Sequence, residues 1–224
     1  MLSIESTTNL LAASDLPERL ARVLAGSEPR RARRAAMSPE LSYGRHAGPA
    51  PITARAAAVM LLLFQREGRW HVPLTERPAV LVRHGGQISL PGGRLDAGET
   101  SCDAARRELV EELGITRGIE TVGRLADCYV FVSDFVVTPW VAVARDEPHW
   151  QPSRHEVERV VELPLDLLLR HDAVEQLAIH RGPFVFQAPC YRVDESRVWG
   201  ATSVILWELA EVLQKIIRDP NTIN

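Results

Sequence analysis

Short apolar segments separated by polar turns begin near residue 56, and their pattern predicts strands. A turn at Glu67-Gly68 separates the first two expected strands, and Ser133-Asp134 separates a later pair. The expected strands cover residues 57–65, 71–76, 122–132, 135–144 and 157–163, and a small hairpin is expected from 184–187 and 191–193. The polar, glycine-rich stretch 92–100 is expected to be a loop.

Helical periodicity marks three longer segments and one short one. Residues 16–25 follow Asp15, residues 102–113 end at Gly114, and the apolar stretch 202–217 is expected to pack on a sheet. A short helix is expected at 165–170. Because mixed strands have helices on both sides along the chain, the pattern predicts an α/β fold, a sandwich with a mixed central sheet.

The charge distribution suggests two parts of unequal size. The first fifty residues carry seven arginines and five acidic residues, a charge of +2, and the remainder carries −5. Residues 1–50 are therefore expected to form an N-terminal helix and arm, and residues 51–224 the main domain. The basic run Arg30–Arg34 is interpreted as a solvated segment before a linker, with a phosphate or nucleic-acid contact as the alternative.

Composition narrows the class of protein. A net charge of −3 argues against binding to nucleic acid mainly through electrostatic attraction. The three cysteines are widely spaced, which argues against a disulfide framework. The longest apolar run, residues 56–64, falls far short of the ~20 residues that span a bilayer. With no secretory pattern in the first residues, the expected location is the cytoplasm, without a membrane partner.

Three carboxylates share one face of the expected helix 102–113. Glu108, Glu111 and Glu112 stand at i, i+3 and i+4, beside a stripe that is expected to be buried and begins at Cys102. No basic residue is expected on that face, so Mg²⁺ or Mn²⁺ would relieve the repulsion. Glu99, in the preceding glycine-rich loop, is expected to approach the same metal site. The alternative is an acidic, solvent-exposed helix face.

The spacing around these carboxylates resembles the Nudix box. Gly93, Glu99 and the run Arg107-Glu108-Leu109-x-Glu111-Glu112-x-Gly114-Ile115 match nine constrained positions over 23 residues. The resemblance implies the Nudix fold and hydrolysis of a nucleoside diphosphate linked to another moiety. It implies that Glu108, Glu111 and Glu112 bind the catalytic metals, that Glu99 supports the site and that Arg107 orients the glutamates. For the general base, Glu108 is the first candidate and Glu156 the second.

Upstream residues are similar to the signature of coenzyme A diphosphatases within the Nudix superfamily. The matching positions are Leu74, Thr75, Arg77, His84, Gly86, Gln87 and Pro91-Gly92-Gly93. The departures are Pro73, Pro78, Val82 and Leu90, with Arg83 next to the position of a usual arginine. The resemblance implies that Arg77, Arg83, Gly92 and Gly93 contact substrate, which is CoA or acyl-CoA cleaved to 3′,5′-ADP and (acyl-)4′-phosphopantetheine.

Two other functions stay open. The departures from the signature keep ADP-ribose, NADH, a dinucleoside polyphosphate or an oxidised nucleotide as substrates of the same chemistry. A non-catalytic nucleotide-sensing module is the third hypothesis, and the intact glutamates Glu108, Glu111 and Glu112 argue against it. Many Nudix enzymes pair as dimers, so the resemblance also allows a homodimer.

Overall fold

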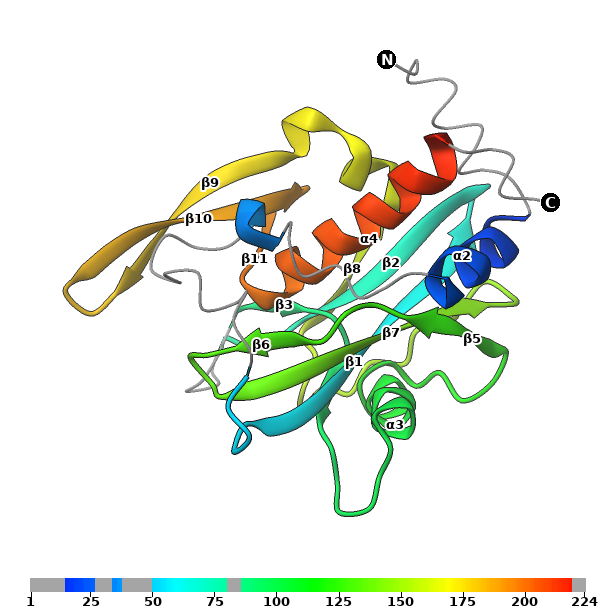
Figure 1. Cartoon of the computed structure of the whole chain (residues 1–224), viewed down its shortest axis with the longest axis horizontal. Coiled ribbons are helices and arrows are strands. Elements are labelled where there is room, and N and C mark those ends of the chain that lie inside the picture. The colour runs from blue at the N-terminus through cyan, green and yellow to red at the C-terminus, as the bar shows by residue number, and fades with distance from the viewer. Residues whose placement is uncertain (1–14, 27–33, 38–49, 80–85, 219–224) are drawn as a thin grey trace.

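The computed structural model describes residues 15–26, 34–37, 50–79 and 86–218. Within them, a mixed sheet forms the centre of the molecule (Figure 1). Its strands are β1 (Arg55–Arg66), β2 (Arg69–Glu76), β3 (Ile88–Ser89), β4 (Gly92–Arg94), β5 (Ile119–Arg124), β6 (Cys128–Val130), β7 (Phe135–Ala144) and β8 (Arg159–Pro164). The order is β3-β2-β1-β7-β5, with β4 paired to β1, β6 to β7 and β8 to β2. The central pair β1–β7 is parallel.

Helices cover both faces of this sheet. Helix α3 (Ser101–Leu113) lies on one face, and α2 (Leu16–Ala25) and α4 (Ala201–Arg218) lie on the other (Figure 1). The alternation of side chains along β1 supplies both cores. Ala58, Met60 and Leu62 pack toward α3, while Leu61 and Leu63 join the core beneath α2 and α4. The expected α/β sandwich is confirmed.

A smaller sheet contains β9 (Val174–Arg181), β10 (Phe184–Val193) and β11 (Ser196–Trp199), in the order β11-β10-β9. The hairpin expected from 184–187 and 191–193 is therefore wrong, because both segments belong to β10. Pro189, between the two expected segments, lies opposite Gln176 inside the strand. A proline also favours extended backbone before it, so the strand passes through.

Two other boundaries differ from the sequence pattern. The strand expected at 122–132 is divided into β5 and β6, and the supposed loop 92–100 begins with β4. At the division, the backbone N–H of Ala126 donates to Oε1 of Glu208 in α4, at 2.8 Å. The carboxylate of Glu208, 82 residues away in sequence, thus accepts the hydrogen bond of a backbone N–H group that lies between the two strands.

The helices were predicted more closely. Helix α2 has the expected bounds, α3 begins one residue early, and the segment expected at 165–170 forms a 3₁₀ helix, η4 (Leu165–Leu169). None of the described helices combines the length and apolar character required to cross a bilayer.

Candidate active site

Helix α3 is capped at both ends, at Thr100 and at Gly114. Oγ1 of Thr100 accepts the backbone N–H of Asp103 at 3.2 Å, and Gly114 ends the helix with φ 74°. Ala105, Leu109 and Leu113 are fully buried against the sheet, which turns the glutamate face toward β2 and β4. The remaining member of the stripe, Cys102, is only partly buried, because it lies in the first turn of the helix.

Glu112 lies deepest in the site. Its side chain is almost fully buried, at 3% exposure. Oε2 accepts the hydroxyl of Thr75 at 2.9 Å, and Oε1 accepts the backbone N–H of Gly92 at 3.3 Å. Burial raises the pKa of this carboxyl to about 7, although both hydrogen bonds oppose the change. In the sequence, Thr75 stands out only as part of the upstream motif, and the sequence pattern did not predict its contact with Glu112.

Glu108 packs directly on the backbone of Gly93. A Cβ built on Gly93 would lie 2.1 Å from Oε1 of Glu108, so only glycine leaves space for the carboxylate. Burial raises the pKa of Glu108 above its ordinary value, and the charges of Glu111 and Glu156 add to the effect. Arg107 opposes it.

Arg107 connects the carboxylates, contrary to the expectation that this helix face lacks a cation. Its guanidinium donates to Glu99 at 2.9 and 3.1 Å, to Glu108 at 2.9 Å and to Glu111 at 2.9 Å, and also to the carbonyl of Arg94 at 3.1 Å. The long side chain reaches both its neighbour and the i+4 position, which residue spacing alone did not reveal.

Glu99 faces Arg107 with both oxygens. Oε1 and Oε2 accept from the guanidinium, and Oε2 also accepts the backbone N–H of Asp96 at 3.0 Å. The hydrogen bond from Arg107 lowers the pKa of Glu99. In this arrangement Glu99 holds Arg107 in place, and Arg107 in turn contacts Glu108 and Glu111.

A turn before β8 brings Glu156 to the same region. The backbone N–H groups of Gln151 and Ser153 donate to the carbonyls of Leu113 and Glu112, at 2.9 and 3.0 Å, and so tie this segment to the end of α3. Glu156 is exposed. Burial is the main cause of the raised pKa of Glu108, and the charge of Glu156 adds to it after that of Glu111.

Arg77 approaches from the end of β2. Its backbone N–H donates to the carbonyl of Gln87 at 3.0 Å, and its charge lowers the pKa of Glu112. Among the described residues, its guanidinium has neither a hydrogen bond nor an ion pair. Arg83, the other arginine expected to contact substrate, lies outside the described residues, as do positions 30–33 of the basic run.

The donor set fits a hard divalent cation. Glu108, Glu111 and Glu112 supply carboxylate oxygens, which Mg²⁺ and Mn²⁺ prefer, and two of the three have pKa values raised by burial. In the part of the chain that the structure covers, no three acidic, histidine or cysteine side chains converge as a ready metal site. Arg107 draws Glu108 and Glu111 together, whereas Glu112 turns to Thr75.

Comparison with known proteins defines the class. The family model described as the NUDIX domain matches residues 54–185. The Nudix hydrolase NudL of Citrobacter koseri is 35% identical over 158 residues, covering 70% of this chain and 82% of that protein. Nudix hydrolase 3 of Caenorhabditis elegans is 30% identical over 175 residues, covering 70% and 73%. The chain therefore belongs to the Nudix family.

The fold agrees with this assignment. A MutT/nudix family protein from Enterococcus faecalis superposes with a TM-score of 0.50 at 17% identity, over 91% of this chain and 76% of that one. The family chemistry is hydrolysis of a diphosphate linkage, and Nudix hydrolases generally require divalent metal ions. Substrates typical of the family are nucleoside diphosphate derivatives.

Proposed function

We propose that this protein is a Mg²⁺- or Mn²⁺-dependent diphosphatase of CoA or acyl-CoA, with 3′,5′-ADP and (acyl-)4′-phosphopantetheine as products. The observation that carries the proposal is the contact between the upstream CoA-type motif and the Nudix glutamates. Thr75 and the backbone of Gly92 both donate to Glu112. Two residues of the upstream motif therefore adjoin a glutamate to which we assign the family chemistry.

The reaction requires water to attack one phosphorus of the diphosphate while the bridging P–O bond breaks. A bound divalent cation, held by Glu108, Glu111 and Glu112, would supply the positive charge that the anionic diphosphate requires. Glu108 is the first candidate to accept the proton of the water, since burial raises its pKa, and Glu156 is the second. Arg107 and Glu99 act as positioning residues, because they fix where the glutamates lie.

Arg77 is the candidate phosphate contact. A guanidinium near the buried Glu112, with no side-chain partner among the described residues, is suited to a substrate oxyanion. Arg77→Ala is expected to raise the KM for CoA roughly 10- to 100-fold with a smaller change in kcat. Arg145→Ala, which removes an exposed arginine paired with Glu120, is the control and should leave both constants unchanged. A change in thermal stability with unaltered KM would make Arg77 structural.

The substrate itself is tested with a panel. CoA, acetyl-CoA, a long-chain acyl-CoA, ADP-ribose, NADH and a dinucleoside polyphosphate are incubated with Mg²⁺ or Mn²⁺, and the products are resolved by chromatography with mass detection. We expect the highest kcat/KM for a CoA compound, with 3′,5′-ADP released. Faster cleavage of ADP-ribose or NADH would overturn the CoA assignment and leave the Nudix chemistry intact.

A further inference from the structure

A cation–π pair lies at the start of β1. Cζ of Arg55, the first residue of this strand, lies 4.1 Å from the centroid of the Phe135 ring, at the start of β7. The parallel register of the two strands pairs these residues directly. Within the described residues, the guanidinium hydrogen-bonds to a backbone carbonyl, that of Ser133, and to no carboxylate. Because Arg55 is exposed and Phe135 is partly buried, the ring supports a guanidinium that a ligand can reach.

The turn between β6 and β7 holds the pair in place. Asp134, in this turn, accepts the hydroxyl of Tyr129 through Oδ1 at 2.9 Å. Its carbonyl accepts the backbone N–H of Arg55 at 3.0 Å, and the carbonyl of Ser133 accepts from the guanidinium. These contacts fix both the backbone and the side chain of Arg55. The guanidinium is therefore oriented before a ligand binds, which lowers the entropic cost of binding.

Exposed apolar side chains accompany the pair. Ile52 lies three residues before Arg55 and is fully exposed, and Val132 lies three residues before Phe135 and is 54% exposed. The described residues contain only five exposed large hydrophobic side chains, so two of them this close in sequence to one cation–π pair indicate a contact surface. An apolar surface that includes a planar cation suits a flat aromatic ligand better than an inorganic anion.

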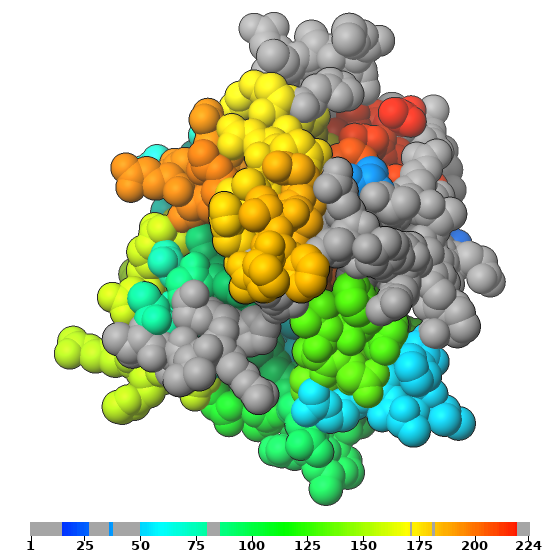
Figure 2. All heavy atoms as spheres, turned by 90° about the vertical axis from the view of Figure 1, so that its left-hand side faces the viewer, coloured from blue at the N-terminus to red at the C-terminus, as the bar shows by residue number. Residues whose placement is uncertain are grey.

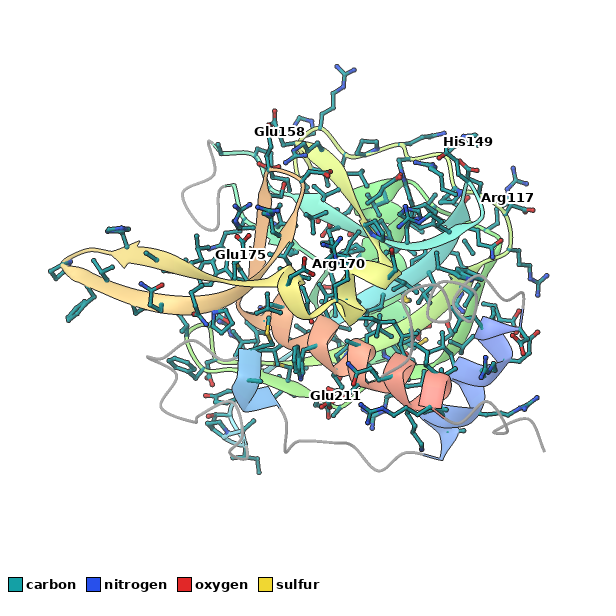
Figure 3. The ribbon with its side chains drawn as sticks, turned by 90° about the horizontal axis from the view of Figure 1, so that it is seen from above. Arg117, His149, Glu158, Arg170, Glu175 and Glu211 are labelled. Carbon is teal, nitrogen blue, oxygen red and sulfur yellow. The ribbon has the colours of Figure 1, made fainter. Side chains whose placement is uncertain are left out.

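The pair lies at the same end of the central sheet as Arg77. Glu158 marks this end, because its backbone N–H donates at 2.8 Å to the carbonyl of the last residue of β2, just before Arg77. Figure 3 shows Glu158 toward the side from which the β9–β10 hairpin extends, and Arg117 and His149 on the opposite side. Figure 2 faces the hairpin side, where the turn between β6 and β7 (green) adjoins residues 50–55 (cyan). The candidate phosphate contact and the cation–π pair thus lie on the same side of the molecule.

The spacing between the pair and the glutamates fits a nucleotide. Ala58, three residues after Arg55 on β1, pairs with Gly93, against which Glu108 packs. Three residues of an extended strand cover about 10 Å. A ribose phosphate bridges a gap of this order, so a base that contacts Arg55 leaves its diphosphate near Glu108.

We propose that Arg55 and Phe135 form the stacking surface for the adenine base of the substrate. The inference rests on the proposed function only in so far as the substrate is an adenine nucleotide, which CoA, ADP-ribose and NADH all are. Guanidinium planes and aromatic rings bind nucleobases by stacking, and the positive charge of the guanidinium attracts the electron-rich face of the base. Arg55 contacts the base, and Phe135 holds the guanidinium plane in position.

Binding of AMP and of ribose 5-phosphate tests this surface, because the two ligands share the sugar and the phosphate and differ in the base. Isothermal titration calorimetry in the presence of Mg²⁺ measures both dissociation constants. The unmodified chain should bind AMP about tenfold or more tightly than ribose 5-phosphate. Arg55→Lys keeps the charge and loses the plane, so it should weaken AMP binding about fivefold or more and leave the binding of ribose 5-phosphate unchanged.

Phe135→Leu is the second variant, since it keeps an apolar side chain and removes the ring beneath the guanidinium. It should also weaken the binding of AMP and not that of ribose 5-phosphate. Two matched variants control for the substitutions themselves. Arg69→Lys changes an exposed arginine that pairs with Asp166, and Phe184→Leu changes an exposed phenylalanine of β10. Both controls should retain the AMP affinity of the unmodified chain.

Equal affinity for AMP and ribose 5-phosphate, or an unchanged AMP affinity in Arg55→Lys, would overturn the proposal. If Phe135→Leu does not fold, Arg55→Lys still decides, because the side chain of Arg55 is exposed. The outcome is separate from the substrate assignment. Selective binding of AMP without cleavage of any CoA compound would refute the CoA assignment and retain the stacking surface. Cleavage of CoA with no selectivity for AMP would do the reverse.

Discussion

Glu112→Gln should lower turnover by about three orders of magnitude or more while leaving the fold intact. The amide keeps the size of the carboxylate and can still hydrogen-bond to Thr75, but it removes an anionic oxygen from the metal-ligand set. Steady-state kinetics on the best substrate of the panel, with Mg²⁺ and with Mn²⁺, measures the loss. Glu111→Gln should have a comparable effect. Near-normal turnover in both variants would contradict the assignment of these glutamates to the metal.

The same variant should be more stable than the unmodified protein at pH 8 without metal. Burial raises the pKa of Glu112 from 4.5 to about 7, so the folded state holds a proton that the unfolded state has released. This group therefore lowers stability as pH rises from about 4.5 to 7, by about 3 kcal/mol once fully ionised. Below pH 4.5 the carboxyl is protonated in both states and the cost vanishes.

Denaturant unfolding at pH 5 and pH 8 in the presence of a chelator measures this difference. The comparison of Glu112→Gln with the unmodified chain isolates the group, because the other carboxylates are common to both. Glu111→Gln is the matched control, since the side chain of Glu111 is 49% exposed and its loss should bring no such gain. If the free energy of unfolding depended equally on pH in the unmodified chain and in Glu112→Gln, the ionised carboxyl of Glu112 would not destabilise the folded state. Added Mg²⁺ or Mn²⁺ should stabilise the unmodified chain most.

Gly93→Ala should reduce turnover about a hundredfold without altering any charged group. The added Cβ would lie 2.1 Å from Oε1 and 2.5 Å from Cδ of Glu108, so this side chain has to move. Because the displaced atoms are the end of a flexible side chain, the fold should tolerate the change, whereas a shift of about 1 Å in a reacting group is costly. Kinetics and thermal unfolding of the same preparation separate the two effects.

Gly92→Ala is the contrasting variant one residue away. Its Cβ would meet backbone, at 2.4 Å from the carbonyl oxygen of Ala58 and 2.7 Å from Cα of Val59. It should therefore destabilise the protein by about 1–3 kcal/mol, as overpacking does. Gly26→Ala, with no heavy atom closer than 3.6 Å, controls for the loss of glycine itself. Equal loss of stability in Gly93→Ala and Gly92→Ala would show that Gly93 serves the sheet and not Glu108.

The sequence by itself predicted helix α3 and the face on which its glutamates lie. The spacing of Glu108, Glu111 and Glu112 and the stop at Gly114 are local features, since helix geometry places residues three and four apart on one face. The cap at Thr100 was not predicted. Helix α2 was predicted with the correct bounds because its amphipathic pattern lies within ten residues. The expected cap was not found, since the side chain of Asp15 makes no capping hydrogen bond. The short apolar run in β1 also predicted a strand.

Only the tertiary structure decided how these carboxylates differ. Glu112 is buried beneath Thr75, 37 residues away, while Glu111 on the same helix face stays half exposed. Desolvation depends on what the rest of the chain packs around a group, so a pattern of neighbours along the sequence does not contain it. The gap between β5 and β6 also depends on a distant residue, because Glu208 in α4 accepts the backbone N–H of Ala126. Likewise, β10 continues through Pro189 as a single strand because it pairs with β9 and β11.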